Sequence, residues 1–505
     1  INFDFATAEG VRRYRAFLEE AADLVAAHGG SLSGEHGDGQ QRGELLARMF
    51  GEELVQAFRD FKAIWDPDNR MNPGKKVDPL PLDADLRPAL RLESPGGTAF
   101  LYPEDAGSFA RAVSRCVGVG KCRRETGGIM CPSFMATGEE KHSTRGRARL
   151  LFEMLQGGEI RDGWRSEEVH DALDLCLACK GCRTECPAGV DMATYKAEFL
   201  HHRYRGRPRP RQAYAMGLVH WWARLAALAP GIANGLGRNP VLKKIAGVHP
   251  DRRLPRLAET TFRARFGKRE PSPSVLLWPD TFTNFFHPET GQAAVEVLEA
   301  AGARVAIPRR ALCCGRPLYD FGMLDLARRQ LRRILEALRP EIEAGVPLVG
   351  LEPSCVAVFR DELVNLFPED EIARRLSRQT FTLAEFLVRQ GWEPPRLAGA
   401  AVVHGHCHHH AVMGMSADRL LLDRLGLNWR LLDSGCCGMA GAFGFEEDHY
   451  EVSMACAERA LLPAVRATGA ETLVVADGFS CREQIAQATG RQALHLAEVL
   501  RKALP

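Results

Sequence analysis

The sequence predicts a multidomain protein with α+β and α/β parts: helical segments at the N-terminus, an α-helical domain built around clustered cysteines, and two repeated α/β lobes. Three observations lead to this fold class. A chain of 505 residues is too long for one hydrophobic core and should form roughly two to four domains. Four cysteines fall between Cys176 and Cys186. Two Cys-Cys-Gly triplets, which begin at Cys313 and Cys436, lie 123 residues apart.

Composition and charge exclude several classes of protein. A hydrophobic fraction of 45% and a charged fraction of 26% are ordinary for a soluble chain. The net charge of +2 argues against a basic nucleic-acid-binding surface, and no run reaches the roughly 18 apolar residues that a membrane span needs. The fifteen cysteines form CxxC and CC pairs, which is not the pattern of an extracellular disulfide framework. We therefore expect reduced metal ligands in a cytoplasmic protein.

The N-terminal segment predicts two helices around a glycine-rich loop. Residues 11–28 carry apolar side chains at helical spacing, and a second helix is expected over about 43–64. The loop between them places Glu35 beside His36. Its glycines let backbone and ligand approach closely, a neutral imidazole accepts a proton, and a carboxylate binds a metal or orients the ring. Taken alone, the loop is better interpreted as a polar turn.

The longer pattern changes that interpretation. The run HGGSLSGEHGDG, a helix and then DPDNRMNPGK resemble the end of the C-terminal cap domain of FAD-linked oxidases of the vanillyl-alcohol-oxidase type, including those that oxidise D-2-hydroxy acids. The resemblance implies that residues 1–77 are the end of such a domain. It also implies that Glu35 ligates a divalent metal (Zn or Mn), that His36 is the base at the hydroxy-acid carbon, and that Asn72 lies on the flavin side as a cofactor-binding residue.

Other features of those FAD-linked oxidases are missing from this sequence. The FAD-binding domain and the upstream His ligands of its metal are absent from the sequence, and the chain begins at Ile1 rather than Met. We therefore expect a fragment of a longer polypeptide that neither holds FAD nor turns over substrate unaided. Residues 78–110, rich in Pro, Leu and Asp, are expected to form a linker.

The cysteine run is the most specific motif. Its spacing, Cys176-x2-Cys179-x2-Cys182-x3-Cys186-Pro, is that of bacterial [4Fe–4S] ferredoxins. Three thiolates at two-residue gaps let a tight loop bind three corners of a cubane cluster. The alternatives are a zinc knuckle and buried thiols, but zinc usually takes two CxxC pairs set well apart. We predict a ferredoxin-like iron–sulfur domain over residues 111–200.

A second, degenerate motif precedes it. Cys116 and Cys122 flank Val119, which stands where a ferredoxin would have another Cys, and Cys131-Pro follows. In two-cluster ferredoxins the Cys before the proline ligates the other cluster. This rule assigns Cys131 to the cluster of Cys176, Cys179 and Cys182, and Cys186 to that of Cys116 and Cys122.

The second cluster then has only three thiolates. It is either a [3Fe–4S] centre, a [4Fe–4S] centre with a non-Cys ligand such as His142, or empty, and we favour two bound clusters over one. Between the motifs, a basic helix begins near Lys141 and runs to about Leu155. The basic side chains of this helix are either solvated or lie beside a cluster, where they would raise the reduction potential of the cluster.

Residues 201–272 are expected to be a basic helical linker. Alternate residues from Arg203 to Arg211 are arginines, and the helix that follows contains Trp221 and Trp222. The plainer interpretation of these aromatic residues is a core or capping helix. The more specific interpretation is that this helix contacts a membrane surface or forms a quinone pocket, because Trp flanked by basic residues is typical of a membrane interface.

Two repeats complete the chain. Cys355 and Cys481 are 126 residues apart, as are Thr281 and Cys407, and short apolar runs alternate with helical segments in each repeat. Such repetition predicts two α/β lobes, 273–395 and 396–505, around a pseudo-twofold axis. A Cys-Cys-Gly turn presents two sulfurs to one metal centre. The predicted ligands are Cys313, Cys314, Cys355, Cys407, Cys436, Cys437 and Cys481.

The lobes resemble the CCG domains of the heterodisulfide reductase B subunit, with departures. Thr281 replaces the leading Cys of the first repeat, while Glu352 and Gly478 occupy the first place of each closing CxxC. One shared cluster or a zinc ion is therefore as consistent with the pattern as an unusual double cubane. The five histidines of the run 404–410 are further candidate ligands, whereas Cys456 lies outside the motifs and is expected to serve packing.

The order of all these parts resembles the bacterial fused FAD-linked and iron–sulfur D-2-hydroxy-acid dehydrogenases of the D-2-hydroxyglutarate dehydrogenase type. The iron–sulfur part also resembles the iron–sulfur subunits of glycolate oxidase and anaerobic glycerol-3-phosphate dehydrogenase. This implies oxidation of a D-2-hydroxy acid, D-2-hydroxyglutarate or D-lactate, with electrons passed through iron–sulfur clusters to a quinone or an electron-transfer protein. The implied location is cytoplasmic, with possible peripheral contact on the inner face of the cell membrane.

Two other functions stay open at this point. The chain is alternatively a stand-alone electron-transfer subunit, in which the cap remnant only docks a partner. Or it is a heterodisulfide-reductase-like enzyme, in which the CCG lobes reduce thiol compounds. The substitution of Thr281 for a cysteine counts against the second alternative.

Overall fold

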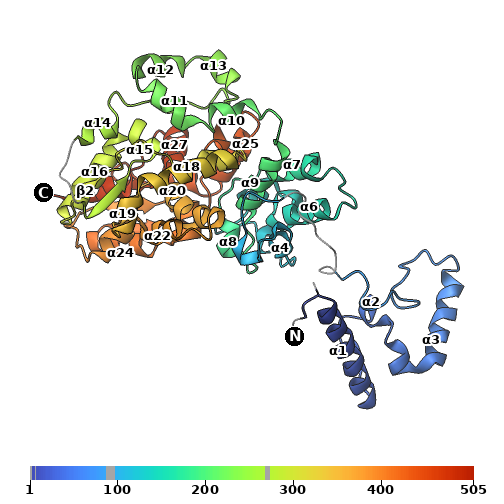
Figure 1. The fold of residues 1–505 in the computed structure, drawn as a ribbon. Helices are drawn as coiled ribbons and strands as arrows, with labels where there is room; N and C mark the ends of the chain where they lie inside the picture. Colours follow the sequence, from blue (N-terminus) through green and yellow to red (C-terminus); the bar gives the residue numbers. More distant parts are fainter. Residues whose placement is uncertain (1–2, 6, 87–96, 268–272) are drawn as a thin grey trace. The chain divides into compact units, whose positions relative to one another are not determined.

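The computed structural model describes residues 3–5, 7–86, 97–267 and 273–505. The chain divides into two compact units, Ile1–Glu93 (unit 1) and Ser94–Pro505 (unit 2), and Figure 1 shows the elements of each. None of the described helices is long and apolar enough to cross a membrane.

Unit 1 is helical and has a small core. Its helices are α1 (Ala8–Ala27), α2 (Gly39–Gly43) and α3 (Leu46–Trp65). The helix α1 begins where the Thr7 hydroxyl accepts a hydrogen bond from the Gly10 backbone. Leu82 and Leu86, from the stretch expected to be a linker, pack in the core of this unit with Tyr14.

The cysteine-bearing part of unit 2 is built from short helices with polar caps. The side chains of Ser143, Ser166 and Asp191 each accept a backbone hydrogen bond at a helix start, and these caps satisfy N–H groups that would otherwise be unpaired. The expected helix near Lys141 is confirmed as α6. The helices are α4 (Phe109–Ser114), α5 (Pro132–Thr137), α6 (Thr144–Gln156), α7 (Glu167–Asp174), α8 (Gly181–Glu185) and α9 (Met192–Arg203).

The stretch just before α4 is fixed by a buried carboxylate. Glu198 of α9 accepts hydrogen bonds from the backbone N–H groups of Ala99 (2.8 Å) and Phe100 (2.9 Å). Tyr102 N donates to Asn365 Oδ1 at 3.0 Å. Residues 99–102 therefore belong to the packed structure of unit 2.

Five short helices follow. The pair α12 and α13 lies at the margin of unit 2, where Figure 1 shows them above the repeated lobes. These helices are α10 (Arg211–Ala215), α11 (Val219–Ala226), α12 (Pro230–Leu236), α13 (Pro240–Ile245) and α14 (Phe262–Phe266).

The two lobes contain parallel sheets of matching order. Lobe 1 (residues 273–395) has the strand order β2-β1-β3-β4, and lobe 2 (residues 396–505) has the order β6-β5-β7. The strands β2, β1 and β3 of lobe 1 therefore correspond to β6, β5 and β7 of lobe 2. This confirms the predicted repeat of α/β lobes. The strands are β1 (Val275–Trp278), β2 (Val305–Ala306), β3 (Leu348–Gly350), β4 (Thr380–Thr382), β5 (Ala400–Val403), β6 (Asn428–Leu431) and β7 (Leu473–Val475).

Helices cover both sheets. In lobe 1 they are α15 (Thr281–Phe285), α16 (Pro288–Ala300), α17 (Arg316–Asp320), α18 (Leu324–Ala337), α19 (Arg339–Glu343), α20 (Pro353–Ala357), the π-helix η6 (Val358–Glu362), α21 (Leu363–Leu366), α22 (Glu371–Gln379) and α23 (Leu383–Arg389). In lobe 2 they are the π-helix η7 (His409–Met413), α24 (Ser416–Leu425), α25 (Tyr450–Glu458), α26 (Leu461–Arg466), α27 (Phe479–Thr489) and α28 (Leu496–Ala503).

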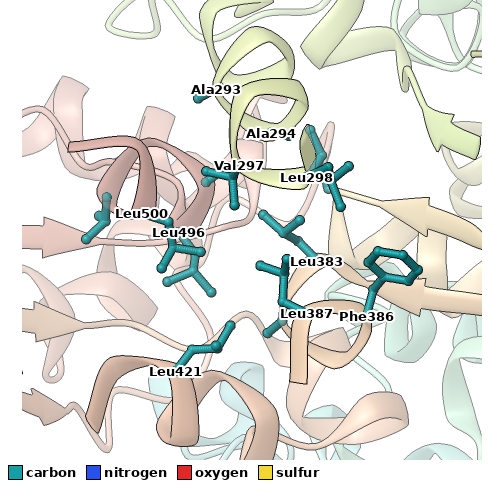
Figure 2. Packing of buried hydrophobic residues seen from close by; sticks show 14 of the residues in the cluster. Ala293, Ala294, Val297, Leu298, Leu383, Phe386, Leu387, Leu421, Leu496 and Leu500 are labelled. Atoms are coloured by element: carbon teal, nitrogen blue, oxygen red, sulfur yellow. The ribbon is translucent and has the colours of Figure 1, made fainter. Parts of the chain in front are cut away.

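One hydrophobic core is shared by the two lobes. Figure 2 shows α16 of lobe 1 packing against α28 of lobe 2, with Val297 close to Leu496. Leu387 of α23 and Leu421 of α24 belong to the same cluster. Full burial of each leucine contributes about 1.5–3 kcal/mol, so the interface between the lobes stabilises both of them.

A buried lysine joins the cysteine loop to lobe 1. Lys180 is 1% exposed, and its Nζ lies 2.8 Å from Asp191 Oδ2, 2.7 Å from Asp361 Oδ2 and 3.3 Å from Glu362 Oε1. These carboxylates hold the pKa of Lys180 above its usual value although burial acts in the opposite direction. The lysine is therefore charged, and its charge is matched inside the protein.

We expect Lys180→Met to lower the free energy of unfolding of unit 2 by about 3–5 kcal/mol, because three buried carboxylates would lose their central cation. Chemical denaturation of the full chain, followed by circular dichroism, measures the loss. The control is Lys141→Met, which removes an exposed lysine paired with Glu139 and should change the free energy by no more than about 0.5 kcal/mol. Equal effects of the two substitutions would contradict this role of Lys180.

Candidate functional site

The predicted catalytic pair lies in unit 1. His36 Nε2 is 3.8 Å from Glu35 Oε2, and both side chains are more than four-fifths exposed. Asn72 is also exposed and adopts a left-handed backbone conformation (φ 49°). Among the described residues, no group of three potential metal ligands contains Glu35 or His36. The catalytic and metal-binding roles of this pair stay predictions.

In unit 2, the start of α6 points at two thiols. Thr144 N donates to Cys131 Sγ at 3.1 Å, and Arg145 N donates to Cys122 Sγ at 3.3 Å. The first turn of a helix carries partial positive charge, which suits thiolates. The hydrogen bond from Cys131, helped by the N–H of Arg145, lowers the pKa of Cys122 to about 6.

The arginine side chains at the basic helix start lie in two different environments. The Arg145 side chain turns away to Glu140 Oε1 (3.2 Å), while Arg147 is buried and donates to Ala172 O (2.6 Å) and to Ser133 Oγ (2.8 Å). The thiols therefore face backbone N–H groups and the hydroxyls of Ser143 and Thr144, while the charge of Arg147 also acts on Cys131.

The ferredoxin-type loop is tightly wound. Ala178 and Lys180 both have positive φ angles (49° and 57°). Gly181 has no space for a side chain, because a Cβ there would lie 2.9 Å from the Ile129 side chain. Met192 N donates to Cys182 Sγ at 3.4 Å, and burial raises the pKa of Cys182 to about 12. Buried thiols of this kind ionise when a cationic metal centre replaces the proton, so the donor set fits an iron–sulfur cluster.

The two cysteine motifs lie together. Cys131 forms a hydrogen bond with Cys122 and also interacts electrostatically with Cys182 of the other motif. A second bridge is Glu185, whose carboxylate accepts hydrogen bonds from the backbone N–H groups of Ile129 and Met130, both at 3.0 Å. The predicted division of ligands between two clusters stays a prediction.

The loop also contacts lobe 2. Cys179 packs in a buried cluster with Cys407 and Cys436, and the backbone carbonyl of Ala178 lies 3.0 Å from His408 Nε2. Cys456 is part of the same cluster, and its Sγ donates to the Pro132 carbonyl at 3.4 Å, in agreement with the packing role expected for it.

In lobe 1, two of the three predicted ligands lie in contact through their sulfurs. The Sγ atoms of Cys314 and Cys355 are 2.9 Å apart, and Gly315 N donates to Cys313 Sγ at 3.4 Å. Thr281 stands where the leading cysteine of the repeat is expected, and its Oγ1 donates a hydrogen bond to Cys313 Sγ at 3.5 Å. Thr281 therefore still contacts a predicted ligand.

His220 is a site residue that the sequence did not reveal. Its Nδ1 is 3.2 Å from Thr281 Oγ1, and burial lowers its pKa to about 4, so the ring is neutral. It precedes the Trp221-Trp222 pair on α11, and only the three-dimensional packing of α11 against α15 brings it to lobe 1.

In lobe 2 the histidine run is divided among different neighbours. His404, Cys437 and Cys481 offer ligand atoms within 4.8 Å of one another, and so do His406, Cys407 and His408. His404 Nδ1 also lies 2.6 Å from Ser434 Oγ. The run therefore includes side chains placed to ligate together with the predicted cysteines.

The structure explains why the closing motifs lack their first cysteine. A Cβ at position 478 would lie 2.2 Å from the His406 ring, so only glycine fits. In lobe 1, Glu352 is buried, and its Oε2 accepts a hydrogen bond from Phe479 N of lobe 2 at 2.8 Å. Gly478 makes room for the His406 ring, and Glu352 links lobe 1 to lobe 2.

A cavity of about 650 Å³ lies beside these groups. Its walls are mainly apolar, and they include Trp222 and Ala223 of α11 together with Phe282, Phe286 and Phe479. Ala178, His406, Cys407 and His408 also line it, so the cavity reaches both the ferredoxin-type loop and lobe 2.

Three family models match the chain in succession. Residues 1–76 match the C-terminal domain of FAD-linked oxidases, residues 112–190 match a 4Fe-4S dicluster domain, and residues 280–360 and 403–486 match the cysteine-rich domain CCG. These matches confirm the predicted fold class, the iron–sulfur part and the FAD-oxidase origin of the first segment.

Curated relatives match most of the chain. D-2-hydroxyglutarate dehydrogenase of Pseudomonas putida is 29% identical over 96% of this chain and 53% of its own length, so this chain spans about half of that protein. The glycolate oxidase iron-sulfur subunit of Escherichia coli is 25% identical over 79% of this chain and 95% of its own length.

A shorter relative covers only part of the chain. Lactate utilization protein A of Bacillus subtilis is 30% identical over 45% of this chain and 98% of its own length. No solved structure matches the chain. The chain therefore belongs to the same family as Lactate utilization protein A.

Proposed function

We propose that this chain is the electron-relaying half of an FAD-dependent dehydrogenase that oxidises a D-2-hydroxy acid, either D-2-hydroxyglutarate or D-lactate. The observation that carries the proposal is the buried contact of Cys179 with Cys407 and Cys436, which joins the ferredoxin-type loop to lobe 2. When bound, iron–sulfur clusters supply one-electron redox chemistry, which complements a flavin that takes two electrons as a hydride. The full activity is proposed for the longer protein, with its FAD.

The cysteines are proposed to hold the clusters as the motifs predict. Cys131 would join Cys176, Cys179 and Cys182, which its interaction with Cys182 supports. Three thiolates, Cys116, Cys122 and Cys186, remain for a second, three- or four-iron centre. The cysteines of the two lobes would bind a further cluster or zinc.

The residues of unit 1 are proposed to act on the substrate. His36 would accept the proton of the substrate hydroxyl, Glu35 would ligate a divalent metal, Zn or Mn, and Asn72 would face the flavin. The high exposure of Glu35 and His36 in unit 1 supports a site that other parts of the longer protein complete.

The electron acceptor is proposed to be a quinone, with a partner electron-transfer protein as the alternative. The apolar cavity of about 650 Å³ offers aromatic walls for a quinone ring and ends at Cys407 and its neighbouring histidines. Above it, α11–α13 expose the large apolar side chains Leu225, Leu228, Ile232, Leu236, Val241 and Ile245.

This exposed apolar surface suits peripheral contact with the inner face of the cell membrane. Lys243 and Lys244 lie in the last turn of α13, and Arg238 precedes that helix. Apolar side chains flanked by basic ones bind anionic lipid surfaces. A membrane at this surface would bring a lipid-soluble quinone to the cavity.

Thiol–disulfide chemistry is the second candidate function. The 2.9 Å separation of the Cys314 and Cys355 sulfurs favours it, because two thiols in contact form a disulfide with little movement. Both cysteines are buried, however, and a substrate disulfide would need a route to them. Reduction of a disulfide substrate by the full chain would support this function.

In the longer, FAD-containing protein, purified without oxygen, we expect iron and acid-labile sulfide and an iron–sulfur EPR signal. The signal should appear on addition of D-2-hydroxyglutarate or D-lactate, because oxidation of the substrate supplies the electrons. Full iron content without reduction by either acid would favour the stand-alone electron-transfer subunit. Zinc without iron would rule out the relay.

Cys179→Ala should remove about four iron atoms per chain, because a cubane cluster needs its thiolate ligands. In the longer protein it should also abolish reduction of a soluble quinone while the flavin is still reduced by substrate. The matched control is Cys456→Ala, another buried cysteine of the same cluster of side chains, which should keep its iron. Iron retained in Cys179→Ala would contradict the assignment.

The membrane contact is tested with the double substitution Leu228→Asp and Ile232→Asp. It should weaken binding of the full chain to phosphatidylglycerol-containing vesicles by at least about tenfold, because each buried large apolar side chain contributes about 1.5–3 kcal/mol. Vesicle flotation measures the binding. Leu24→Asp with Ile64→Asp alters two similarly exposed residues of unit 1 and should have no effect. An equal loss in both proteins would contradict a specific surface.

A further inference from the structure

A group of metal-ligand side chains lies apart from the cysteines. His409, Asp418 and Asp477 each offer one ligand atom, and these atoms lie within 4.8 Å of one another. His409 begins the π-helix η7 after β5, Asp418 is on α24, and Asp477 follows β7. Because β5 and β7 are neighbouring parallel strands, their carboxyl ends bring His409 and Asp477 to one edge of the sheet.

Two of these side chains are deeply buried, and their polar atoms are incompletely paired. His409 is 1% exposed and Asp418 is 3% exposed. His409 Nδ1 forms no hydrogen bond, and His409 Nε2 and Asp418 Oδ2 have only each other, as an ion pair at 3.1 Å. Leaving a buried polar atom unpaired costs about 1–3 kcal/mol, so the unpaired ring nitrogen beside this pair indicates a missing partner.

A small cavity marks where that partner would lie. Its volume is about 10 Å³, and His409, Asp418, Asp477 and Met415 line it. A cavity of this size holds a single water molecule or ion. Asp477 Oδ1 accepts a hydrogen bond from Leu496 N at 2.8 Å, which fixes the orientation of that carboxylate beside the cavity.

We propose that His409, Asp418 and Asp477 bind one divalent transition-metal cation, with Zn²⁺ as the favoured ion. The distance from His409 Nε2 to Asp418 Oδ2 is 3.1 Å. Tetrahedral bonds of about 2.0–2.2 Å to one ion separate neighbouring ligand atoms by roughly 3.3–3.6 Å, so these two atoms need to move apart by only a few tenths of an ångström to hold an ion. One imidazole and two carboxylates are also a donor set that suits Zn²⁺ or Mn²⁺ and not an iron–sulfur cluster.

The ion would have a structural role. It would tie together η7, α24 and the end of β7, and the histidine run 404–410 is held between these elements. His404 and Cys407 on that run belong to the two ligand groups of lobe 2. Loss of the ion is therefore expected to loosen the loop that presents these ligands.

The competing explanation is a buried ion pair without metal. The carboxylate of Asp418 raises the pKa of His409 to about 8 against the effect of burial, and Asp477 also interacts with His495 and Arg482. An imidazolium paired with Asp418 would need no cation. The two explanations differ in metal content.

The test compares full-length wild-type chain with Asp418→Asn, both purified without oxygen. Elemental analysis should show that the variant has lost about one equivalent of zinc or manganese, while iron and acid-labile sulfide stay at wild-type levels. The matched control is Asp423→Asn, which changes an exposed aspartate on the same helix and should keep the metal.

A second variant keeps the test decisive if the first does not fold. If Asp418→Asn fails to fold, His409→Gln removes the nitrogen ligand with little change of volume and should lose the same equivalent. Cobalt reconstitution gives an independent readout: the variant should bind about one cobalt fewer than wild type with unchanged sulfur-to-cobalt charge-transfer bands, because the lost site has only nitrogen and oxygen ligands. Metal content equal to wild type in both variants, or a wild-type chain with no zinc or manganese, would overturn the proposal and leave the ion pair.

Discussion

The arrangement of the iron–sulfur half depends on the burial of one ammonium group. Lys180 lies inside the ferredoxin-type motif, between Cys179 and Cys182, and its partners Asp361 and Glu362 belong to η6 of lobe 1. Burying a charge costs several kcal/mol unless its partners are in place. The ion pairs therefore favour the arrangement in which the loop docks on lobe 1, and in that arrangement Cys179 of the loop packs against Cys407 and Cys436 of lobe 2.

Much of the fold was predictable because its evidence is local or repeated. The apolar runs that become β1, β3, β5 and β7 are short and lie at matching places in the two repeats. The strand β4 was missed, because Thr-Phe-Thr carries no such pattern and pairs with β3 only in the folded lobe. The ferredoxin-type spacing likewise predicted a tight loop, and the positive φ angles of Ala178 and Lys180 provide it.

What the sequence could not reveal depends on contacts between distant residues. Lys180 has the appearance of an ordinary surface lysine in a motif, because Asp361 lies 181 positions away. His220 reaches Thr281 across 61 positions. The departures from the CCG pattern were visible in the sequence, but their reasons were not: position 478 must be glycine because the His406 ring lies against it, and Glu352 is kept by its bond to Phe479.

The common core of the lobes restricts how the repeat can change. Since α16 and α28 pack in the same hydrophobic cluster, a larger side chain at Val297 would crowd the core of both repeats, at a cost of typically about 1–3 kcal/mol. Loss of one lobe would likewise expose core side chains of the other. The cysteine-bearing turns of both lobes lie outside this shared core, and so does Thr281, so a change in these turns leaves the packing between the lobes intact.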